Sequence, residues 1–214
     1  MKNNPIGTDD VPTQVKNPKL VEQRRMQIVD AAVPLFIENG FHKTTTRQIA
    51  KAAKVSVGSM YEYVASKEDI LYLACLSIHN HVEQGVTSAI SKTTSGREML
   101  KEVIREYFMV CDRMNDQILL MYQVTQSLPQ QWQNKVLEND IRISNLIIDA
   151  LNRAMNEGGI PKLSEKTCDM VAQNITVLGH MWTFRRWHFA RSYSIDEYID
   201  LQTRFILGLL AESP

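Results

Sequence analysis

Three observations on the sequence predict an all-α protein. Apolar residues recur at spacings of three and four along most of the 214-residue chain. Serine, threonine, proline and glycine stand where helices begin and end, and no segment alternates apolar with polar residues as a strand would. The composition, with 44% apolar residues, is that of an ordinary globular protein.

We expect residues 1–17 to form a flexible N-terminal tail, because Pro5 and Pro12 stand there among polar residues without an apolar period. Basic residues cluster where this tail meets the first helix. They either reach phosphates or a minor groove of a nucleic acid, or they belong to a solvated helix start. These residues are Lys16, Lys19, Arg24 and Arg25.

The first helix has an apolar face that includes Ile28 and Phe36, and it should end near Gly40, where glycine can adopt a left-handed backbone. Thr45 and Gln48 are spaced as a capping box for a second helix of about two turns. A serine at position 56 can cap a third helix, whose Met60 and Val64 should point back to the first two. Two short helices joined by a tight turn place a recognition helix in the major groove of DNA.

In this stretch the sequence resembles the TetR family of bacterial transcriptional regulators. The matching positions are Gly40-Phe41, Thr44-Thr45, Ile49-Ala50, Val55-Ser56, Gly58, Tyr61, Tyr63 and Ser66-Lys67-Glu68. Lys54 departs from the pattern, since glycine is usual in that turn, and we expect slight backbone strain there.

The resemblance implies which residues contact operator DNA. Small residues let the recognition helix approach the base edges, and Tyr61, Tyr63 and Lys67 reach phosphates. The DNA-binding set carried over in this way is Thr45, Thr46, Arg47, Ser56, Val57, Gly58, Ser59, Tyr61, Tyr63 and Lys67. The charge distribution agrees with it. Residues 16–67 carry nine Lys/Arg against four Asp/Glu, a net +5, whereas residues 68–214 carry fourteen against eighteen, a net −4.

We predict two domains after the tail, a helix-turn-helix DNA-binding domain over residues 18–66 and a helical effector-binding and dimerisation domain over residues 67–214. The later helices have clear start signals, and about nine helices are expected in all. The signals are Ser66, Ser95 with Glu98, Pro129, Ser164, and Ser194 with Glu197.

The resemblance also implies a homodimer, held by a four-helix bundle formed by residues 164–190 and 195–211 of two subunits. The sequence supports this independently, because apolar residues from Ile195 to Leu210 cover too much of the circumference for a helix packed on one side only.

In similar proteins the middle helices enclose a small hydrophobic or amphipathic inducer. The resemblance places in that pocket Tyr107, Cys111, Met114, Met121, Tyr122, Thr125, Asn174, Met181, Trp182 and Arg185. Each residue taken alone is better explained as part of the core. A basic cluster that includes Arg185, Arg186 and Arg191 either holds an anionic head group, such as that of an acyl-CoA, or forms ion pairs with acids such as Asp196 and Asp200.

Other classes of protein lack support in the sequence. The five histidines form no metal-ligand motif, and no phosphate-binding glycine loop or nucleophile elbow is present, so we expect no enzyme, metal or cofactor. Three widely spaced cysteines read as reduced core residues of a cytoplasmic protein. No apolar run is long enough for a membrane span, and no membrane partner is expected.

The sequence therefore predicts a ligand-responsive transcriptional repressor that binds a palindromic operator as a homodimer and is released by a small hydrophobic inducer, with an acyl-CoA as one candidate. The alternative is a constitutive DNA-binding protein without an inducer. A change in DNA affinity on ligand binding would separate the two.

Overall fold

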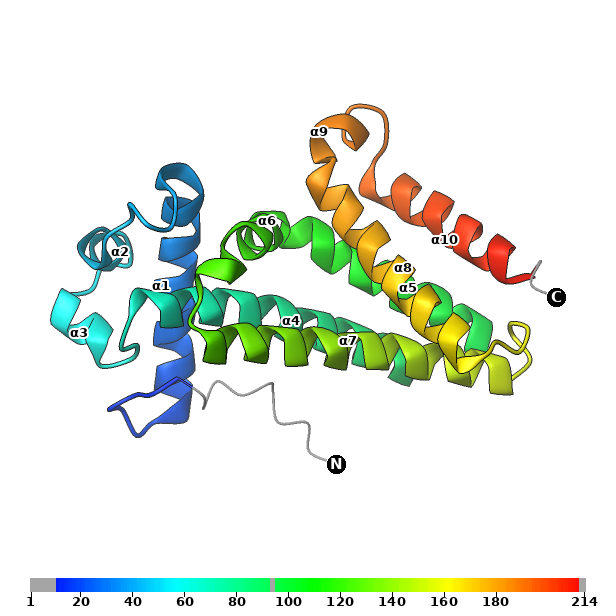
Figure 1. The fold of residues 1–214 in the computed structure, drawn as a ribbon, viewed down its shortest axis with the longest axis horizontal. Coiled ribbons are helices and arrows are strands. Elements are labelled where there is room, and N and C mark those ends of the chain that lie inside the picture. Colours follow the sequence, from blue (N-terminus) through cyan, green and yellow to red (C-terminus); the bar gives the residue numbers. More distant parts are fainter. Residues whose placement is uncertain (1–10, 93–94, 212–214) are drawn as a thin grey trace. The chain divides into compact units, whose positions relative to one another are not determined.

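The computed structural model describes residues 11–92 and 95–211. Within these residues the regular structure consists of ten α-helices and one short 3-10 helix, without a strand (Figure 1). The all-α prediction is confirmed. We expected about nine helices, and the additional one is α9 (Arg186–Phe189), which is too short for apolar periodicity to reveal.

The chain divides into two compact units. Unit 1 comprises Met1–Asn80 and Asp116–Asn139, and unit 2 comprises His81–Asn115 and Asp140–Pro214. Two long helices, α4 (Lys67–Lys92) and α7 (Gln130–Asn156), contribute residues to both units. The packing units therefore do not divide at position 66, and our functional boundary there stays a prediction.

Unit 1 begins with α1 (Pro18–Asn39), which is capped by Asn17 and ends at Gly40, where φ is +80°. The buried face of α1 runs from Val21 to Phe36, and the helix continues through Pro34. The two short helices of the expected motif follow as α2 (Thr46–Ala52) and α3 (Val57–Tyr61). The remaining elements of unit 1 are α6 (Asn115–Val124), the 3-10 helix at Thr125–Ser127 and the first turns of α4 and α7.

A buried carboxylate joins α4 to α7 within unit 1. One oxygen of Asp69 accepts hydrogen bonds from the backbone N–H groups of Ala65 and Ser66 at 2.9 Å, and the other accepts one from Nε1 of Trp132 at 3.1 Å. The Trp132 ring stacks on Tyr72 with 4.3 Å between ring centroids. The Ser66 hydroxyl in turn accepts from the Asp69 N–H, so Ser66 caps α4 as expected.

Unit 2 packs α5 (Gly96–Arg113) against α8 (Glu165–Phe184) and α10 (Ile195–Ala211). The close contact of α5 with α8 requires a glycine. A Cβ atom added at Gly179 would lie 2.6 Å from the Tyr107 ring and 3.0 Å from Sγ of Cys111. Glycine at this position therefore lets the two helices approach each other.

The predicted helix starts in unit 2 have different outcomes. Ser194 and Glu197 form the expected reciprocal bonds, at 2.7 Å from the Ser194 N–H to the carboxylate and 3.2 Å from the Glu197 N–H to the hydroxyl. Ser164 caps α8 at 3.1 Å from the Thr167 N–H. The spacing of Ser95 and Glu98 also predicts a capping box, and this prediction is wrong, because the Ser95 side chain makes no cap bond. The expected helix over 164–190 is interrupted at Arg185, where φ is −115° and ψ is 20°.

All three cysteines are free and buried, as expected of reduced core residues. Burial raises the pKa of the Cys75 and Cys111 thiols to about 12, because a thiolate would be poorly solvated there.

Candidate DNA-binding surface and effector unit

The two helices of the motif begin at side-chain caps, as the sequence predicts. The Thr45 N–H donates to Oε1 of Gln48 at 2.8 Å, and the Gln48 N–H donates to the Thr45 hydroxyl at 3.3 Å. At the start of α3 the Ser59 N–H donates to the Ser56 hydroxyl at 3.0 Å. Met60 and Val64 are fully buried against the rest of unit 1. A helix of five residues is unstable alone, so these buried contacts hold α3 in place.

The turn between α2 and α3 contains the expected strain. Lys54 has a φ of +55° and is the only described residue other than glycine with positive φ. The turn is closed by the Val55 N–H, which donates to the Ala50 carbonyl at 3.0 Å. Lysine therefore stands where the left-handed backbone favours glycine, and the unfavourable conformation is maintained by the surrounding fold.

The exposed side of α3 carries the small residues of the predicted DNA-binding set. Ser56 and Gly58 are exposed, and a Cβ atom added at Gly58 would meet only the Ser56 hydroxyl, at 3.9 Å. The fold of the free protein thus leaves room for a side chain at Gly58. Because Gly58 has no side chain, the backbone of α3 can approach base edges closely. Val57 and Ser59 are half-buried beside them.

Tyr61 and two residues of α2 complete this surface. Tyr61 is 41% exposed, and its hydroxyl donates to the Thr46 hydroxyl at 3.3 Å, which links α3 to α2. Arg47 is exposed. The structure thus brings together Thr45, Thr46, Arg47, Ser56, Gly58 and Tyr61 on the accessible part of the motif.

Two residues of the predicted set lie elsewhere. Tyr63 is only 7% exposed, so most of its side chain belongs to the core. The Lys67 ammonium donates to the carbonyls of Phe41, His42 and Thr44 at 2.7, 3.3 and 3.0 Å, and it lies 4.5 Å from the centre of the Phe41 ring. This ammonium holds the segment between α1 and α2, and contact with a phosphate would require it to exchange some of these bonds.

Arg25 is neither solvated nor available to phosphate. It is 4% exposed, and its guanidinium donates to the carbonyls of Tyr63, Val11 and Pro12. The tail expected over 1–17 is described from residue 11 onward, and there the chain is hydrogen-bonded to the rest of unit 1. Residues 1–10 lie outside the described residues.

Three of the predicted effector residues of unit 2, Tyr107, Cys111 and Trp182, belong to a buried polar cluster between α5 and α8. The Tyr107 hydroxyl lies 2.9 Å from Nε2 of His180, and the Thr183 hydroxyl donates to the Cys111 carbonyl at 3.2 Å. Nε1 of Trp182 donates to Oδ1 of Asp112 at 2.8 Å. The set also includes Met114, which is buried, and Met181, which is half-buried.

The other predicted ligand residues lie apart from this cluster. Met121, Tyr122 and Thr125 belong to unit 1, where Tyr122 is 52% exposed and the Thr125 hydroxyl donates to the Met121 carbonyl. Asn174 is exposed on α8, and Arg185 is exposed with its guanidinium 5.5 Å from the Trp187 ring.

Sequence reasoning missed two residues of the cluster, His180 and Asp112. His180 stands next to Gly179 in an apolar helix, and such a buried polar residue needs a partner. Asp112 binds both Trp182 and Arg186, whose guanidinium lies 3.0 Å from the carboxylate. The arginine cluster was expected either to hold an anionic head group or to form ion pairs. Arg186 forms an ion pair, but with Asp112, which was not among the acids named above. Asp196 pairs instead with Arg105 on α5 at 2.7 Å.

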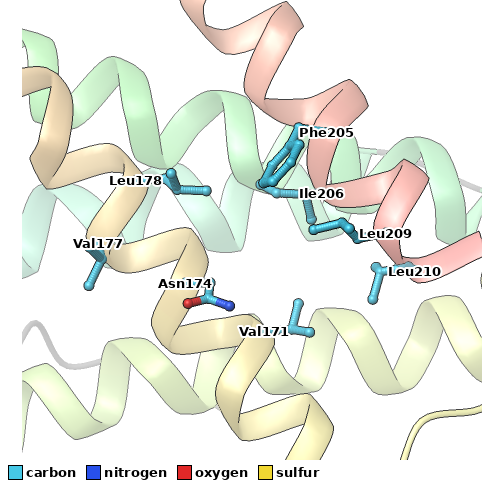
Figure 2. Close-up of a pocket in the computed structure, with 8 residues that line it drawn as sticks. All are labelled: Val171, Asn174, Val177, Leu178, Phe205, Ile206, Leu209 and Leu210. Atoms are coloured by element: carbon cyan, nitrogen blue, oxygen red, sulfur yellow. The ribbon is translucent and has the colours of Figure 1, made fainter. Parts of the chain in front are cut away.

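An apolar groove runs between α8 and α10 on the surface of unit 2 (Figure 2). Its volume is about 300 Å³, and seven of its eight lining residues are apolar. Phe205 and Leu209 on α10 are 58% and 53% exposed, and Val177 on α8 is 60% exposed. Figure 2 shows Asn174 among these side chains, so this residue lines the groove and not the interior.

Comparisons with known proteins identify the family. The model described as bacterial regulatory proteins, tetR family, matches residues 28–72, which span α2, α3 and their flanks. The HTH-type transcriptional regulator HbdR of Aromatoleum sp. (strain CIB) is 33% identical over 194 residues, which cover 91% of this chain and 83% of HbdR. The chain belongs to the TetR family.

Solved structures of other proteins share the fold. A bacterial regulatory protein of this family from Rhodococcus RHA1 has a TM-score of 0.76 at 19% identity, with 90% of this chain and 99% of that chain covered. The crystal structure of AibR in complex with isovaleryl coenzyme A and operator DNA has a TM-score of 0.70 at 15% identity, with 86% and 98% covered.

Membership of the TetR family makes this chain a DNA-binding transcriptional regulator, and it accounts for the helix-turn-helix of unit 1. Within the described residues, no group of three or more His, Cys, Asp or Glu side chains is arranged to hold a metal ion. None of the helices in the described part of the chain has the length and apolar character needed to cross a membrane.

Proposed function

We propose that this TetR-family protein is a homodimeric repressor that binds a palindromic operator in the cytoplasm. The observation that carries the proposal is the exposed α3 surface of Ser56, Gly58 and Tyr61, on which Ser56 and Gly58 are small enough for the helix to approach base edges in a major groove. One helix-turn-helix reads one half-site, and a two-fold dimer reads two.

The α8–α10 groove supports the second copy. Phe205, Leu209 and Val177 are each more than half exposed. A patch of exposed apolar side chains such as this is typical of a surface that a partner protein covers. Because the groove is built from the helices that the family resemblance assigns to dimerisation, the proposed occupant is the same surface of a second chain.

A matched pair of substitutions tests the dimer. Phe205→Glu should give a monomer in analytical ultracentrifugation and should weaken operator binding, because one half-site retains too little affinity. Ile141→Glu is the control, since Ile141 is 60% exposed on α7, outside the groove. A dimeric Phe205→Glu variant would place the interface elsewhere.

We infer further that the operator is released by a small apolar or amphipathic ligand, with acyl-CoA thioesters as the candidate class. The structurally similar AibR was crystallised with isovaleryl coenzyme A and operator DNA together, which supports acyl-CoA thioesters as the class of ligand. Release from the operator is the part of the proposal that the titration below tests. Arg185 and Arg191 are exposed cations near α9 that suit the anionic end of such a ligand.

The decisive experiment selects DNA from a random pool with the purified protein and then titrates ligands against the selected complex. A palindromic consensus and release by acyl-CoA, weakened in Arg185→Ala, are the expected results. A ligand shifts this equilibrium only by its difference in affinity for the free and DNA-bound forms, so DNA should weaken ligand binding by the same factor. Release by neutral compounds alone would reject the anion site, and no release by any bound ligand would favour a constitutive DNA binder.

A further inference from the structure

The recognition helix α3 is followed by backbone carbonyls that its own turns do not pair. Such groups at a helix end require partners from elsewhere, and α3 has only five residues with which to fix its position. Its fully buried residue Met60 fixes the middle of the helix, and α3 packs against α2. The orientation of its C-terminal end depends on what binds Glu62 and Tyr63, the two residues that follow it.

Residues 11–14, which we name the strap, supply partners for Glu62. The Gln14 N–H donates to the Glu62 carbonyl at 3.1 Å, and the Thr13 hydroxyl donates to the same oxygen at 2.9 Å. Val11 anchors the strap, since it is only 1% exposed. Figure 1 draws these residues in dark blue beside the N-terminal end of α1.

Arg25 forms hydrogen bonds both to the strap and to the segment that follows α3. Its Nε donates to the Tyr63 carbonyl at 2.9 Å, while one terminal nitrogen donates to the carbonyls of Val11 and Pro12. A guanidinium presents several donors in one rigid plane, so it can serve chain segments that approach from different directions. A lysine ammonium at the end of a flexible stem lacks this geometry, although it carries the same charge.

We propose that Arg25 and the strap form a clamp that orients α3 for operator binding, with Arg25 as a positioning residue that does not contact DNA. The proposal rests on α3 being the recognition helix. Loss of the clamp makes the segment after Tyr61 more mobile. The face formed by Ser56, Gly58 and Tyr61 must then lose conformational entropy when it binds in the major groove, which weakens operator binding.

Operator affinity at several salt concentrations distinguishes positioning from phosphate contact. Arg25→Lys should lower the affinity roughly tenfold, the usual effect of losing hydrogen bonds made by a charged group. The dependence of log affinity on log salt should keep its wild-type slope, whereas loss of a phosphate contact reduces that slope by about 1. An unchanged affinity or a reduced slope would overturn the positioning role.

Two truncations test the strap itself. Removing residues 1–14 should lower affinity as Arg25→Lys does, and combining both changes should cost no more than the larger single change, because they remove one clamp. Removing residues 1–10 is the matched control and should leave affinity unchanged. Additive losses would show that the two parts act separately and would reject the clamp.

Hydrogen exchange without DNA separates this proposal from the proposed function. The amides of residues 59–64 should exchange faster in Arg25→Lys, in the 1–14 truncation and in Thr13→Val. The last variant removes an exposed hydroxyl that donates to the Glu62 carbonyl and accepts from the Val15 N–H. Exchange equal to wild type in all three would overturn the clamp, whatever DNA the protein binds. Thermal unfolding checks that each affinity is measured on folded protein. Variants that unfold at a lower temperature but bind the operator normally when folded would also reject the clamp.

Discussion

The hydroxyl of Tyr107 lies 2.9 Å from Nε2 of His180, in the buried contact between α5 and α8. Residues 73 positions apart thus satisfy each other inside an apolar unit. Their helices approach closely because Gly179 has no side chain.

Tyr107→Phe should destabilise the protein, because it removes this hydroxyl from His180 while keeping the ring. We expect the free energy of unfolding to fall by about 1–3 kcal/mol, the usual cost of depriving a buried polar group of a partner. Denaturant unfolding measures the change. Tyr193→Phe is the control at a 40% exposed tyrosine, and an equal effect of both variants would contradict the prediction.

Tyr61→Ala should weaken operator binding without much change in stability, since Tyr61 is 41% exposed on α3. The expected loss in binding free energy is about 1–3 kcal/mol. Fluorescence anisotropy with labelled operator provides the measurement. Wild-type affinity in this variant would contradict the proposal that the exposed α3 surface binds DNA.

Lys67→Ala should lower both stability and operator affinity, because its ammonium holds three backbone carbonyls between α1 and α2. We expect the free energy of unfolding to fall by about 1–3 kcal/mol. Tyr61→Ala, measured in the same unfolding and binding assays, is the comparison, because it should lower affinity without lowering stability. If Lys67→Ala lost affinity alone, the direct phosphate contact expected from the sequence would be the better account.

Lys54→Gly should preserve or raise stability, by up to about 1 kcal/mol, because it relieves the positive φ of the turn. The control is Lys51→Gly in α2, where glycine should cost about 1 kcal/mol relative to a good helix former. Thermal unfolding of the two variants gives the comparison. A similar destabilisation at both positions would show that Lys54 contributes more than its backbone conformation.

Stability should fall as the pH is lowered from about 6.5 toward 4. Burial lowers the pKa of His79 to about 4, because the charged imidazolium is poorly solvated there. The unfolded state, with its ordinary pKa of about 6.5, therefore binds more protons in this window, and acid favours unfolding by up to about 3 kcal/mol. Unfolding at pH 4.5 and 7.5 should show a smaller difference in His79→Leu than in wild type, whereas His188→Gln, at an exposed histidine, should behave as wild type.

The sequence by itself determined most of the features that depend on neighbouring residues, with the capping box expected at Ser95 as the exception. The box at Thr45 and Gln48, the cap at Ser56 and the end of α1 at Gly40 were all predictable, because each bond joins residues a few positions apart. The strain at Lys54 was predictable for the same reason, since backbone preference is a property of one residue. The all-α class and the helix-turn-helix follow from these local signals.

Only the tertiary structure decided what the isolated polar side chains do. Lys67 was expected to contact phosphate, and Arg25 was expected either to contact a nucleic acid or to be solvated. Instead, Arg25 binds carbonyls that lie 13 to 38 positions away, and Lys67 binds carbonyls 23 to 26 positions away. Likewise, Tyr63 is buried, and His180 was not foreseen as the partner of Tyr107. A charge or hydroxyl can be satisfied by water, phosphate or a distant part of the chain. The sequence does not distinguish these cases, because the choice depends on which segments the packing of the helices brings together.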